Sequence, residues 1–119
     1  MLWTNSNPNT GWGGGTATLS DSISNYPLIK VVFKLQASSG NIQYSTIMEV
    51  EDFKQTTNLS RAGTIAGGVI GRPSAAIYAR GFWYISDTAV GFGQATGVGN
   101  NYTNGDIVVP ISIIGLSVG

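Results

Sequence analysis

The sequence predicts an all-β fold, an antiparallel β-sandwich or jelly-roll-like head formed by a single domain. Three observations support this prediction. Hydrophobic residues make up 42% of the 119 residues, which is enough to bury a core without crosslinks. Several segments alternate apolar and polar side chains with the period of two that is typical of half-buried strands. These segments follow one another at a spacing of about ten residues, with Gly, Asn and Pro between them, and none has a capped helical stripe.

The composition excludes several kinds of chemistry. The chain has no cysteine and no histidine, which excludes disulfides, zinc sites with Cys or His ligands, and a Ser-His-Asp triad within this chain. Lys and Arg total 6, as do Asp and Glu, and 10% charged residues is far below the roughly 25% of an ordinary domain. We therefore expect no nucleic-acid partner, no metal and no cofactor. No apolar run approaches the roughly 20 residues of a membrane span, and we expect neither membrane insertion nor an export signal.

The first part of the chain is expected to form an irregular lead-in and then a hairpin. Residues 1–15 form the lead-in, because "NSNPNTGWGGG" holds turn formers around a single Trp. The strand at 26–36 places its apolar side chains on one face: Ile29, Val31, Phe33 and Leu35. Its other face carries Lys30, Lys34 and Gln36 and is expected to meet water. The partner strand at 42–51 alternates Ile42, Tyr44, Met48 and Val50 with Gln43, Ser45, Glu49 and Glu51.

Further strands are expected at 63–71, 74–86, 88–95 and 105–116, the last after an Asn104-Gly105 turn. This last strand is apolar on both faces: Ile107, Val109, Ile111 and Ile113 share one, and Val108 and Ile114 lie on the other. A strand of this kind is buried on both sides, either as a central strand or against another chain. Pro110 lacks an N–H group and belongs at an edge or a bulge, which favours a contact between subunits. We therefore expect an oligomer.

Three segments have a superficial resemblance to catalytic, phosphate-binding or metal-binding motifs. Glu49 and Glu51, two apart on one predicted strand, would hold their carboxylates about 7 Å apart, within the range of inverting glycosidases. A general acid needs a buried carboxyl group, and these lie on the predicted wet face, so a solvated acidic edge is favoured over calcium binding or catalysis. "GFGQATG" (91–97) lacks the spacing of a phosphate loop, and "NGD" (104–106) lacks the acidic ligands of a calcium loop. Glycines in a loop or bulge and a hairpin turn explain them.

The aromatic segment "RGFWYIS" (80–86) is a better candidate for a binding surface. Alternation places Arg80, Phe82 and Tyr84 on one face and Trp83 and Ile85 on the other, and the sequence alone does not decide which face is core. Exposed aromatic planes beside polar groups suit sugar rings, whose C–H groups lie on aromatic faces while their hydroxyls form hydrogen bonds. For Trp83, core packing is the alternative. The candidate saccharide contacts are Arg80, Trp83, Asp87, Asn100, Asn101 and Tyr102.

Both ends of the chain resemble a known family. "LWTNSNPNTGW…ATLSDSISNYPLIKVVFK" (2–34) is similar to the opening of head domains at the C-terminal end of tail-fibre, baseplate and minor tail proteins of bacteriophages that infect Gram-positive hosts. "VVPISIIGL" (108–116) is similar to the end of those domains. The middle matches only in an arginine before an aromatic strand, Arg80. Trp12 stands where the family usually has Phe, and "GGGTATL" replaces its Gln-containing strand.

The resemblance implies a β-sandwich-like head, commonly trimeric, at the virion tail tip, where it contacts a host-surface saccharide. The expected function is thus that of a non-enzymatic receptor-binding head, synthesised in the bacterial cytoplasm. The expected partners are host polysaccharide, further copies of the chain as a homotrimer, and other tail proteins. A chain of this length would be a head without its shaft. The alternatives are a structural tail-tip or assembly module without glycan binding, and a polysaccharide depolymerase that uses Glu49 and Glu51.

Overall fold

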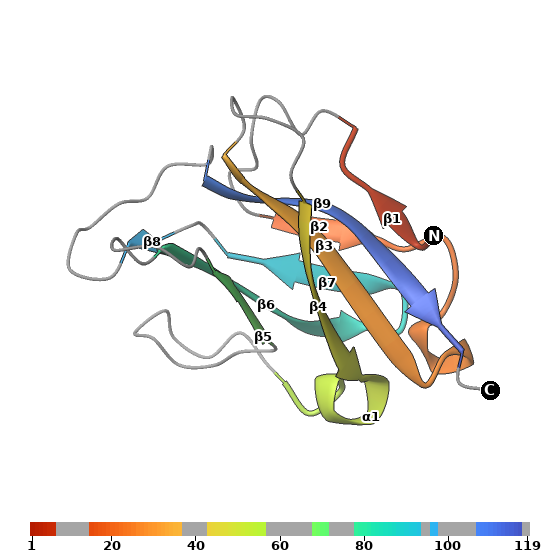
Figure 1. Cartoon of the computed structure of the whole chain (residues 1–119). Coiled ribbons are helices and arrows are strands. Elements are labelled where there is room, and N and C mark those ends of the chain that lie inside the picture. The colour runs from red at the N-terminus through yellow and green to blue at the C-terminus, as the bar shows by residue number, and fades with distance from the viewer. Residues whose placement is uncertain are drawn as a thin grey trace.

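The computed structural model describes residues 1–6, 15–36, 43–56, 68–71, 78–93, 96–97 and 107–117. In this part of the chain the strands form two antiparallel sheets that pack face to face (Figure 1). Sheet A has the order β1 (Trp3–Thr4), β9 (Ile107–Leu116), β3 (Leu28–Gln36) and β4 (Gln43–Glu49). Sheet B has the order β2 (Gly15–Thr18), β7 (Ala89–Phe92), β6 (Tyr78–Ser86) and β5 (Gly68–Gly71), and β8 (Thr96–Gly97) also pairs with β6. The prediction of an all-β sandwich is confirmed.

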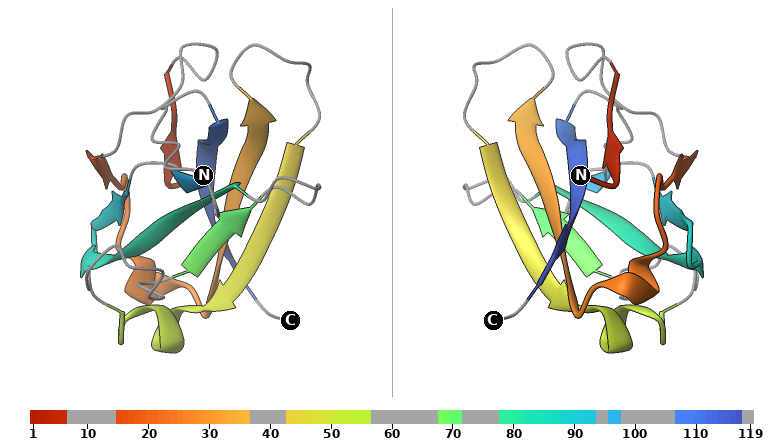
Figure 2. Two further views of the ribbon diagram at one scale, coloured as in Figure 1. Left: turned by 90° about the vertical axis from the view of Figure 1, so that its left-hand side faces the viewer. Right: turned by 90° about the vertical axis from the view of Figure 1, so that its right-hand side faces the viewer.

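The two sheets form separate layers whose strands cross. In Figure 1, β3, β4 and β9 lie in front of β6 and β7. In the left view of Figure 2, β1, β9, β3 and β4 stand side by side, and β6 runs obliquely to them. The helix α1 (Val50–Phe53) lies at one end of the sandwich, directly after β4. No helix of the described residues is long and apolar enough to cross a membrane.

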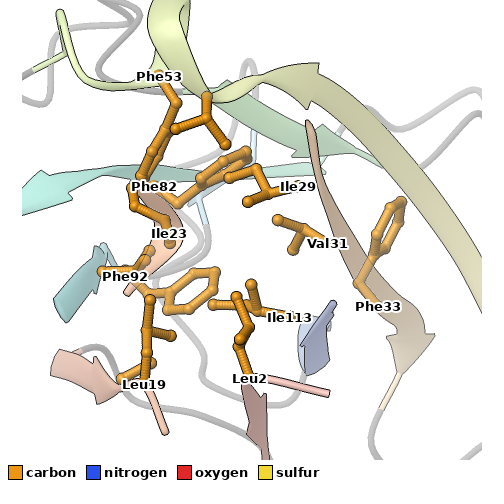
Figure 3. Packing of buried hydrophobic residues seen from close by; sticks show 13 residues of the cluster. Leu2, Leu19, Ile23, Ile29, Val31, Phe33, Phe53, Phe82, Phe92 and Ile113 are labelled. Atoms are coloured by element: carbon orange, nitrogen blue, oxygen red, sulfur yellow. The ribbon is translucent and has the colours of Figure 1, made fainter. Parts of the chain in front are cut away.

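The core lies between the layers and receives side chains from both sheets and from two helical turns (Figure 3). Phe82 of β6 packs against Phe53 of α1 and Phe92 of β7, with ring centroids 5.9 and 6.0 Å apart. Burial of each such side chain contributes roughly 1.5–3 kcal/mol. The other fully buried members of the core are Ala17, Ile23, Ile29, Val31, Val90 and Ile113. Because α1 and the 3₁₀ turn η2 (Ile23–Asn25) supply Phe53 and Ile23, these two short turns close the core at one end.

The predicted hairpin of the strands at 26–36 and 42–51 is present as β3 and β4, which pair from Leu28↔Glu49 to Lys34↔Gln43. Ile29, Val31 and Phe33 are buried on the core face, as predicted. The prediction for the opposite face is wrong at Lys34, which is only 5% exposed. Alternation identifies the face that points away from the other sheet, but it does not reveal what covers that face.

The C-terminal strand β9 is an interior strand of sheet A, between β1 and β3, as one of the two alternatives predicted. Pro110 lies at a β-bulge: Phe33 pairs with Pro110 and Val32 with Ser112, so Ile111 is the extra residue. The bulge therefore accommodates Pro110 within a single chain, without a contact between subunits. The Asn5 side chain donates a hydrogen bond of 3.0 Å to the Pro110 carbonyl oxygen.

This bulge also overturns the prediction that Val109 and Ile113 share one face of β9. Ile113 pairs with Val31, whereas Val109 pairs with Lys34. Val31 and Lys34 are three residues apart on β3 and therefore lie on opposite faces. Ile113 accordingly belongs to the core, while the buried Val109 lies on the outer face of sheet A.

The predicted irregular lead-in at 1–15 is wrong at both of its ends. Trp3 and Thr4 form β1, which pairs with β9, and Gly15 begins β2, which pairs with β7. The Leu2 N–H group donates a hydrogen bond of 2.7 Å to the Ile113 carbonyl oxygen, and the Leu2 side chain is buried in the core. A two-residue strand is too short to show alternation, so the sequence pattern does not reveal it. Residues 7–14 and the predicted turn at Asn104-Gly105 lie outside the described residues.

Candidate functional site

The structure decides which face of the aromatic segment in β6 is core. Phe82 is fully buried and Tyr84 packs against the core, whereas Ile85 is 47% exposed and Trp83 is partly exposed. Trp83 and Ile85 thus lie on the outer face of sheet B, which points away from sheet A. The alternative in which Trp83 packs into the core is wrong.

The indole ring of Trp83 lies over the neighbouring strand β7. Trp83 and Gly91 are cross-strand partners, and a Cβ atom at Gly91 would lie 2.7 Å from indole Cζ2. A Cβ atom at Gly93 would lie 3.5 Å from Cζ3, so the ring extends along the strand from Gly91 to Gly93. Because glycine has no side chain, the ring can lie flat on the backbone there. Gly91 and Gly93 of "GFGQATG" therefore lie under an aromatic ring, and Gly91 is itself in a strand.

The described side chains around Trp83 on this face are uncharged. Thr16 pairs with Gly91 from the other side of β7, so its side chain lies on the same face as Trp83, and it is exposed. Thr18 and Ser86 both pair with Ala89 and so lie on this face with it, and the exposed Ile85 is the extra residue at the register shift between Tyr84 and Ser86. None of these residues carries a charge. A partly exposed indole plane with hydroxyl groups nearby can bind a flat apolar surface that also bears hydroxyls, such as the face of a neutral sugar ring.

Asp87, another predicted contact, belongs to a different cluster at the turn between β6 and β7. The Tyr84 hydroxyl donates a hydrogen bond of 2.6 Å to Asp87 Oδ1, and the Ser24 hydroxyl donates one of 3.0 Å to Oδ2. Lys54 Nζ lies 3.5 Å from Oδ1 and donates a hydrogen bond to Ser24 Oγ. The backbone carbonyl oxygen of Asp87 accepts a hydrogen bond of 2.9 Å from the Ile23 N–H group. Asp87 therefore joins β6, η2 and the segment after α1.

The electrostatics of this cluster favour a structural role over catalysis. The hydrogen bond from the Tyr84 hydroxyl is the main cause that holds the pKa of Asp87 below its ordinary value, with smaller contributions from Ser24 and Lys54. The same hydrogen bond raises the pKa of Tyr84. An ionised carboxylate that already accepts from two hydroxyls is a weak general base and cannot serve as a general acid at neutral pH. Ser24 is therefore not an activated nucleophile, although Lys54 lies beside it.

A second cluster of this kind, which the sequence analysis did not identify, lies beside η2. Asp21 accepts hydrogen bonds from the Tyr26 hydroxyl (3.0 Å), from Asn25 Nδ2 (2.9 Å) and from the Ser22 N–H group (2.8 Å). The hydrogen bond from Tyr26 is the main cause that lowers the pKa of Asp21, and it raises the pKa of Tyr26. The Ser22 side chain caps η2 by accepting from Ser24 N–H at 3.2 Å. The signal for this cluster is the run "SDSISNY", in which Ser and Asp precede a helical turn.

The other predicted contacts are only partly described. Arg80 lies in β6, where its backbone pairs with Ile70 of β5, and its side chain is outside the described part. Asn100, Asn101 and Tyr102 lie outside the described residues altogether. The structure does not bring Asp87 to the Trp83 surface: Asp87 bonds with Tyr84, whose ring lies on the core side of β6.

The predicted pairing of Glu49 and Glu51 on one strand is wrong. β4 ends at Glu49, and Glu51 lies in the first turn of α1. The period-two spacing of about 7 Å therefore does not apply. Both side chains are exposed, as predicted for a solvated acidic edge. Across the ranges that the structure describes, no group of three His, Cys, Asp or Glu residues is arranged to hold a metal ion.

Comparison of the chain with known protein families, with curated proteins and with solved structures finds no match. The fold and the site define a class on their own: an all-β sandwich domain with an aromatic surface on the outside of one sheet, where the described side chains carry no charge.

Proposed function

We propose that this chain is the receptor-binding head of a bacteriophage tail protein and that it binds a host cell-surface saccharide without cleaving it. The resemblance of both chain ends to such heads suggests the biological setting, a virion tail tip. The all-β sandwich is compatible with that setting. The single observation that supports saccharide binding is the indole of Trp83, which lies flat over Gly91 on a face without charged side chains among the described residues.

The chemistry of that face favours a neutral sugar. A C–H-bearing ring face can stack on the indole, and exposed hydroxyl groups such as that of Thr16 can exchange hydrogen bonds with sugar hydroxyls. An anionic polymer would find no cation among the described side chains of this face. The absence of an enzymatic step is part of the proposal, because Glu49 and Glu51 are exposed and lie on different elements, and Asp87 is engaged in hydrogen bonds.

The test is binding of the purified chain to a glycan array and to cell walls of Gram-positive bacteria. Trp83→Ala should weaken binding at least about tenfold, because the stacking plane is lost, whereas Trp83→Phe should retain part of it. Ile47→Ser, on the outer face of sheet A, is the control that should leave binding unchanged. Circular dichroism must show that every variant keeps its β structure. If no saccharide binds, or if Trp83→Ala binds like the wild type, saccharide recognition on this face is wrong.

A structural tail-tip module that binds other virion proteins is the second candidate. It is favoured by a different observation, the exposed apolar residues Tyr44 and Ile47 of β4 on sheet A. Binding to isolated tail proteins with no binding to host walls would support this candidate instead. A depolymerase would release sugars from host walls, and Glu49→Gln would lower that rate. We expect no release from the wild type.

A further inference from the structure

The indole ring of Trp83 has a polar end and an apolar end on the outer face of sheet B. A Cβ atom at Gly91 would lie closest to ring atoms Nε1 and Cε2, whereas a Cβ atom at Gly93 would lie 3.5 Å from Cζ3. The ring nitrogen is therefore at the Gly91 end of the ring. At the other end, the Gly93 N–H group donates a hydrogen bond of 2.9 Å to the Gly81 carbonyl oxygen, and these two glycines offer a ligand no polar side chain.

Two hydrogen-bonding groups meet at the Gly91 end of the ring. Thr16 is the cross-strand partner of Gly91 on β2, and its exposed side chain lies on the same face as Trp83. Adjacent strands are about 4.8 Å apart, so the Thr16 hydroxyl lies one strand away from the backbone over which Nε1 is placed. No hydrogen bond joins the indole N–H group or the Thr16 hydroxyl to another described residue. The N–H group can only donate, whereas the hydroxyl both donates and accepts, so one ligand oxygen can bind to both.

The direction of the N–H bond limits which sugar oxygens can reach it. This bond lies in the plane of the indole, while the atoms of a sugar ring stacked on the indole lie about 3.5–4 Å above that plane. A hydrogen bond needs a distance of about 2.9 Å and a nearly straight N–H···O angle. An equatorial hydroxyl remains close to the plane of the sugar ring and is too high above Nε1. An axial hydroxyl on the stacked face would hold the sugar ring away from the indole.

An oxygen on a flexible side group of the sugar meets the requirement, because the side group can bend past the rim of the indole. The hydroxymethyl group of a hexopyranose and the acetamido carbonyl of an N-acetylated sugar both carry such an oxygen. We call it the pendant oxygen. A pentopyranose without an acetamido group has none, although its C–H face stacks in the same way. The geometry of Nε1 and Thr16 can therefore separate sugars that stacking alone does not.

We propose, on the basis of the saccharide binding proposed above, that Thr16 and the indole N–H group of Trp83 together select a neutral pyranose with a pendant oxygen. The C–H face of the sugar lies on the indole. The pendant oxygen accepts a hydrogen bond from Nε1 and forms a second one with the Thr16 hydroxyl. The edge of the sugar that carries no side group lies at the Gly93 end. Trp83 thus supplies the stacking plane, and Thr16 is the specificity-determining residue.

The first experiment compares three neutral glycosides by NMR titration of the Trp83 indole N–H resonance, which Trp83→Phe assigns. Methyl β-D-glucopyranoside should bind about fivefold more tightly than methyl β-D-xylopyranoside, which differs only in lacking the hydroxymethyl group. If the acetamido carbonyl is the bound oxygen instead, methyl N-acetyl-β-D-glucosaminide should bind about fivefold more tightly than both. Either result supports the proposal. Equal binding of the three glycosides, or binding of none of them, overturns it.

The second experiment removes the Thr16 hydroxyl. Thr16→Val keeps the shape of the side chain, and it should weaken binding of the preferred glycoside about fivefold while binding of the xyloside is unchanged. Thr18→Val is the matched control, because Thr18 is also exposed on this face of β2 but pairs with Ala89. In the background of Trp83→Phe, which has an aromatic plane without the N–H group, Thr16→Val should have a smaller effect.

The outcomes separate this proposal from the proposed function. If Thr16→Val prefers the same glycoside by the same ratio as the wild type, the selection by Thr16 is wrong. Binding to host cell walls that Trp83→Ala abolishes would leave the proposed function intact even then. If the wild type binds neither host walls nor any glycoside, both proposals are wrong. Circular dichroism must show that Thr16→Val and Thr18→Val keep their β structure.

Discussion

The indole ring of Trp83 lies directly over Gly91 on the adjacent strand, where a Cβ atom would come within 2.7 Å of ring carbon Cζ2. Gly91 is buried by this ring although it lies on the outer face of sheet B. The strand residue and the ring therefore depend on each other: the ring shields the backbone of β7, and the missing side chain leaves room for the ring.

Gly91→Ala is expected to destabilise the fold, although alanine is usually better than glycine in a strand. Replacing glycine by alanine in a strand ordinarily stabilises a protein by roughly 0.5–1 kcal/mol. Overpacking, by contrast, typically costs about 1–3 kcal/mol. The net loss should be about 1 kcal/mol, measured by urea unfolding. In the background of Trp83→Ala the clash disappears, and the same substitution should then stabilise the chain. This reversal of sign is the result that identifies the ring as the cause.

Gly93→Ala is the matched control for the comparison of Gly91→Ala in the wild type and in the Trp83→Ala background. A Cβ atom at Gly93 would meet Trp83 Cζ3 at 3.5 Å and the Gly81 carbonyl oxygen at 3.8 Å, which are ordinary contacts. The free energy of unfolding should change by less than about 0.5 kcal/mol. Equal losses for the Gly91 and Gly93 substitutions would contradict the geometry.

Gly115→Ala tests a second aromatic contact, this time on the core side of β9. A Cβ atom there would lie 2.6 Å from Tyr26 Cδ1. Tyr26 packs against the core, and its hydroxyl donates to Asp21, so the ring has less freedom to move than that of Trp83. We expect a larger fall in Tm than for Gly91→Ala, measured by calorimetry. In a Tyr26→Ala background, the Gly115→Ala substitution should lose most of its effect on Tm.

Much of the fold follows from local patterns in the sequence. The alternation in β3 identifies Ile29, Val31 and Phe33 as core, because one period-two face is enough to orient a strand. Alternation separates Phe82 and Tyr84 from Trp83 and Ile85, as the structure does, but which face is buried depends on the side of β6 that meets the other sheet. That is a tertiary property, and neither face of "RGFWYIS" is polar enough to decide it.

Two of the errors share a physical cause, namely a feature that interrupts the period of a strand. The bulge at Pro110 shifts the register by one residue, which moves Val109 to the face opposite Ile113. The single turn of α1 ends the alternation of β4 at Glu49, so Glu51 leaves the strand. The ring of Trp83 over Gly91 depends on the register of two strands that only the fold fixes. Asp87 was identified as a polar site residue, but its partners come from two other segments.

Thr56 connects the end of the α1 segment to sheet B and offers a specific test. Its hydroxyl donates a hydrogen bond of 2.6 Å to the Phe53 carbonyl oxygen and accepts one of 3.0 Å from the Tyr84 backbone N–H group. Thr56→Val keeps the shape but loses both bonds, and we expect a loss of about 1–2 kcal/mol in the free energy of unfolding. Thr56→Ser should be close to the wild type, because the hydroxyl is retained. Similar losses for both variants would mean that the methyl group matters more than the hydrogen bonds.

The pKa shifts of the Tyr84–Asp87 pair predict how stability depends on pH. The pKa of Asp87 is lowered from 3.8 in the folded chain, mainly by the Tyr84 hydroxyl, so the unfolded chain binds a proton more readily. The contribution of Asp87 to folding stability is therefore present above pH 3.8. It is lost as the pH falls through the lower pKa that Asp87 has in the folded chain. The pKa of Tyr84 is raised from 10.0, mainly by Asp87. The contribution of Tyr84 to folding stability is present below pH 10.0. It is lost as the pH rises through the higher pKa that Tyr84 has in the folded chain.

Tyr84→Phe separates this pair from the Asp21–Tyr26 pair, whose pKa values shift in the same directions. The variant keeps the aromatic ring against Phe53 but removes the hydroxyl that Asp87 accepts from. We expect Tm to fall less steeply with pH on both the acid and the alkaline side than in the wild type, and Tyr84→Phe/Tyr26→Phe to flatten both sides further. An NMR titration gives the direct readout, since the pKa of Asp87 should rise in Tyr84→Phe while that of Asp21 stays lowered. If the Asp87 carboxyl titrates alike in the wild type and Tyr84→Phe, the hydrogen bond between the two side chains does not form in solution.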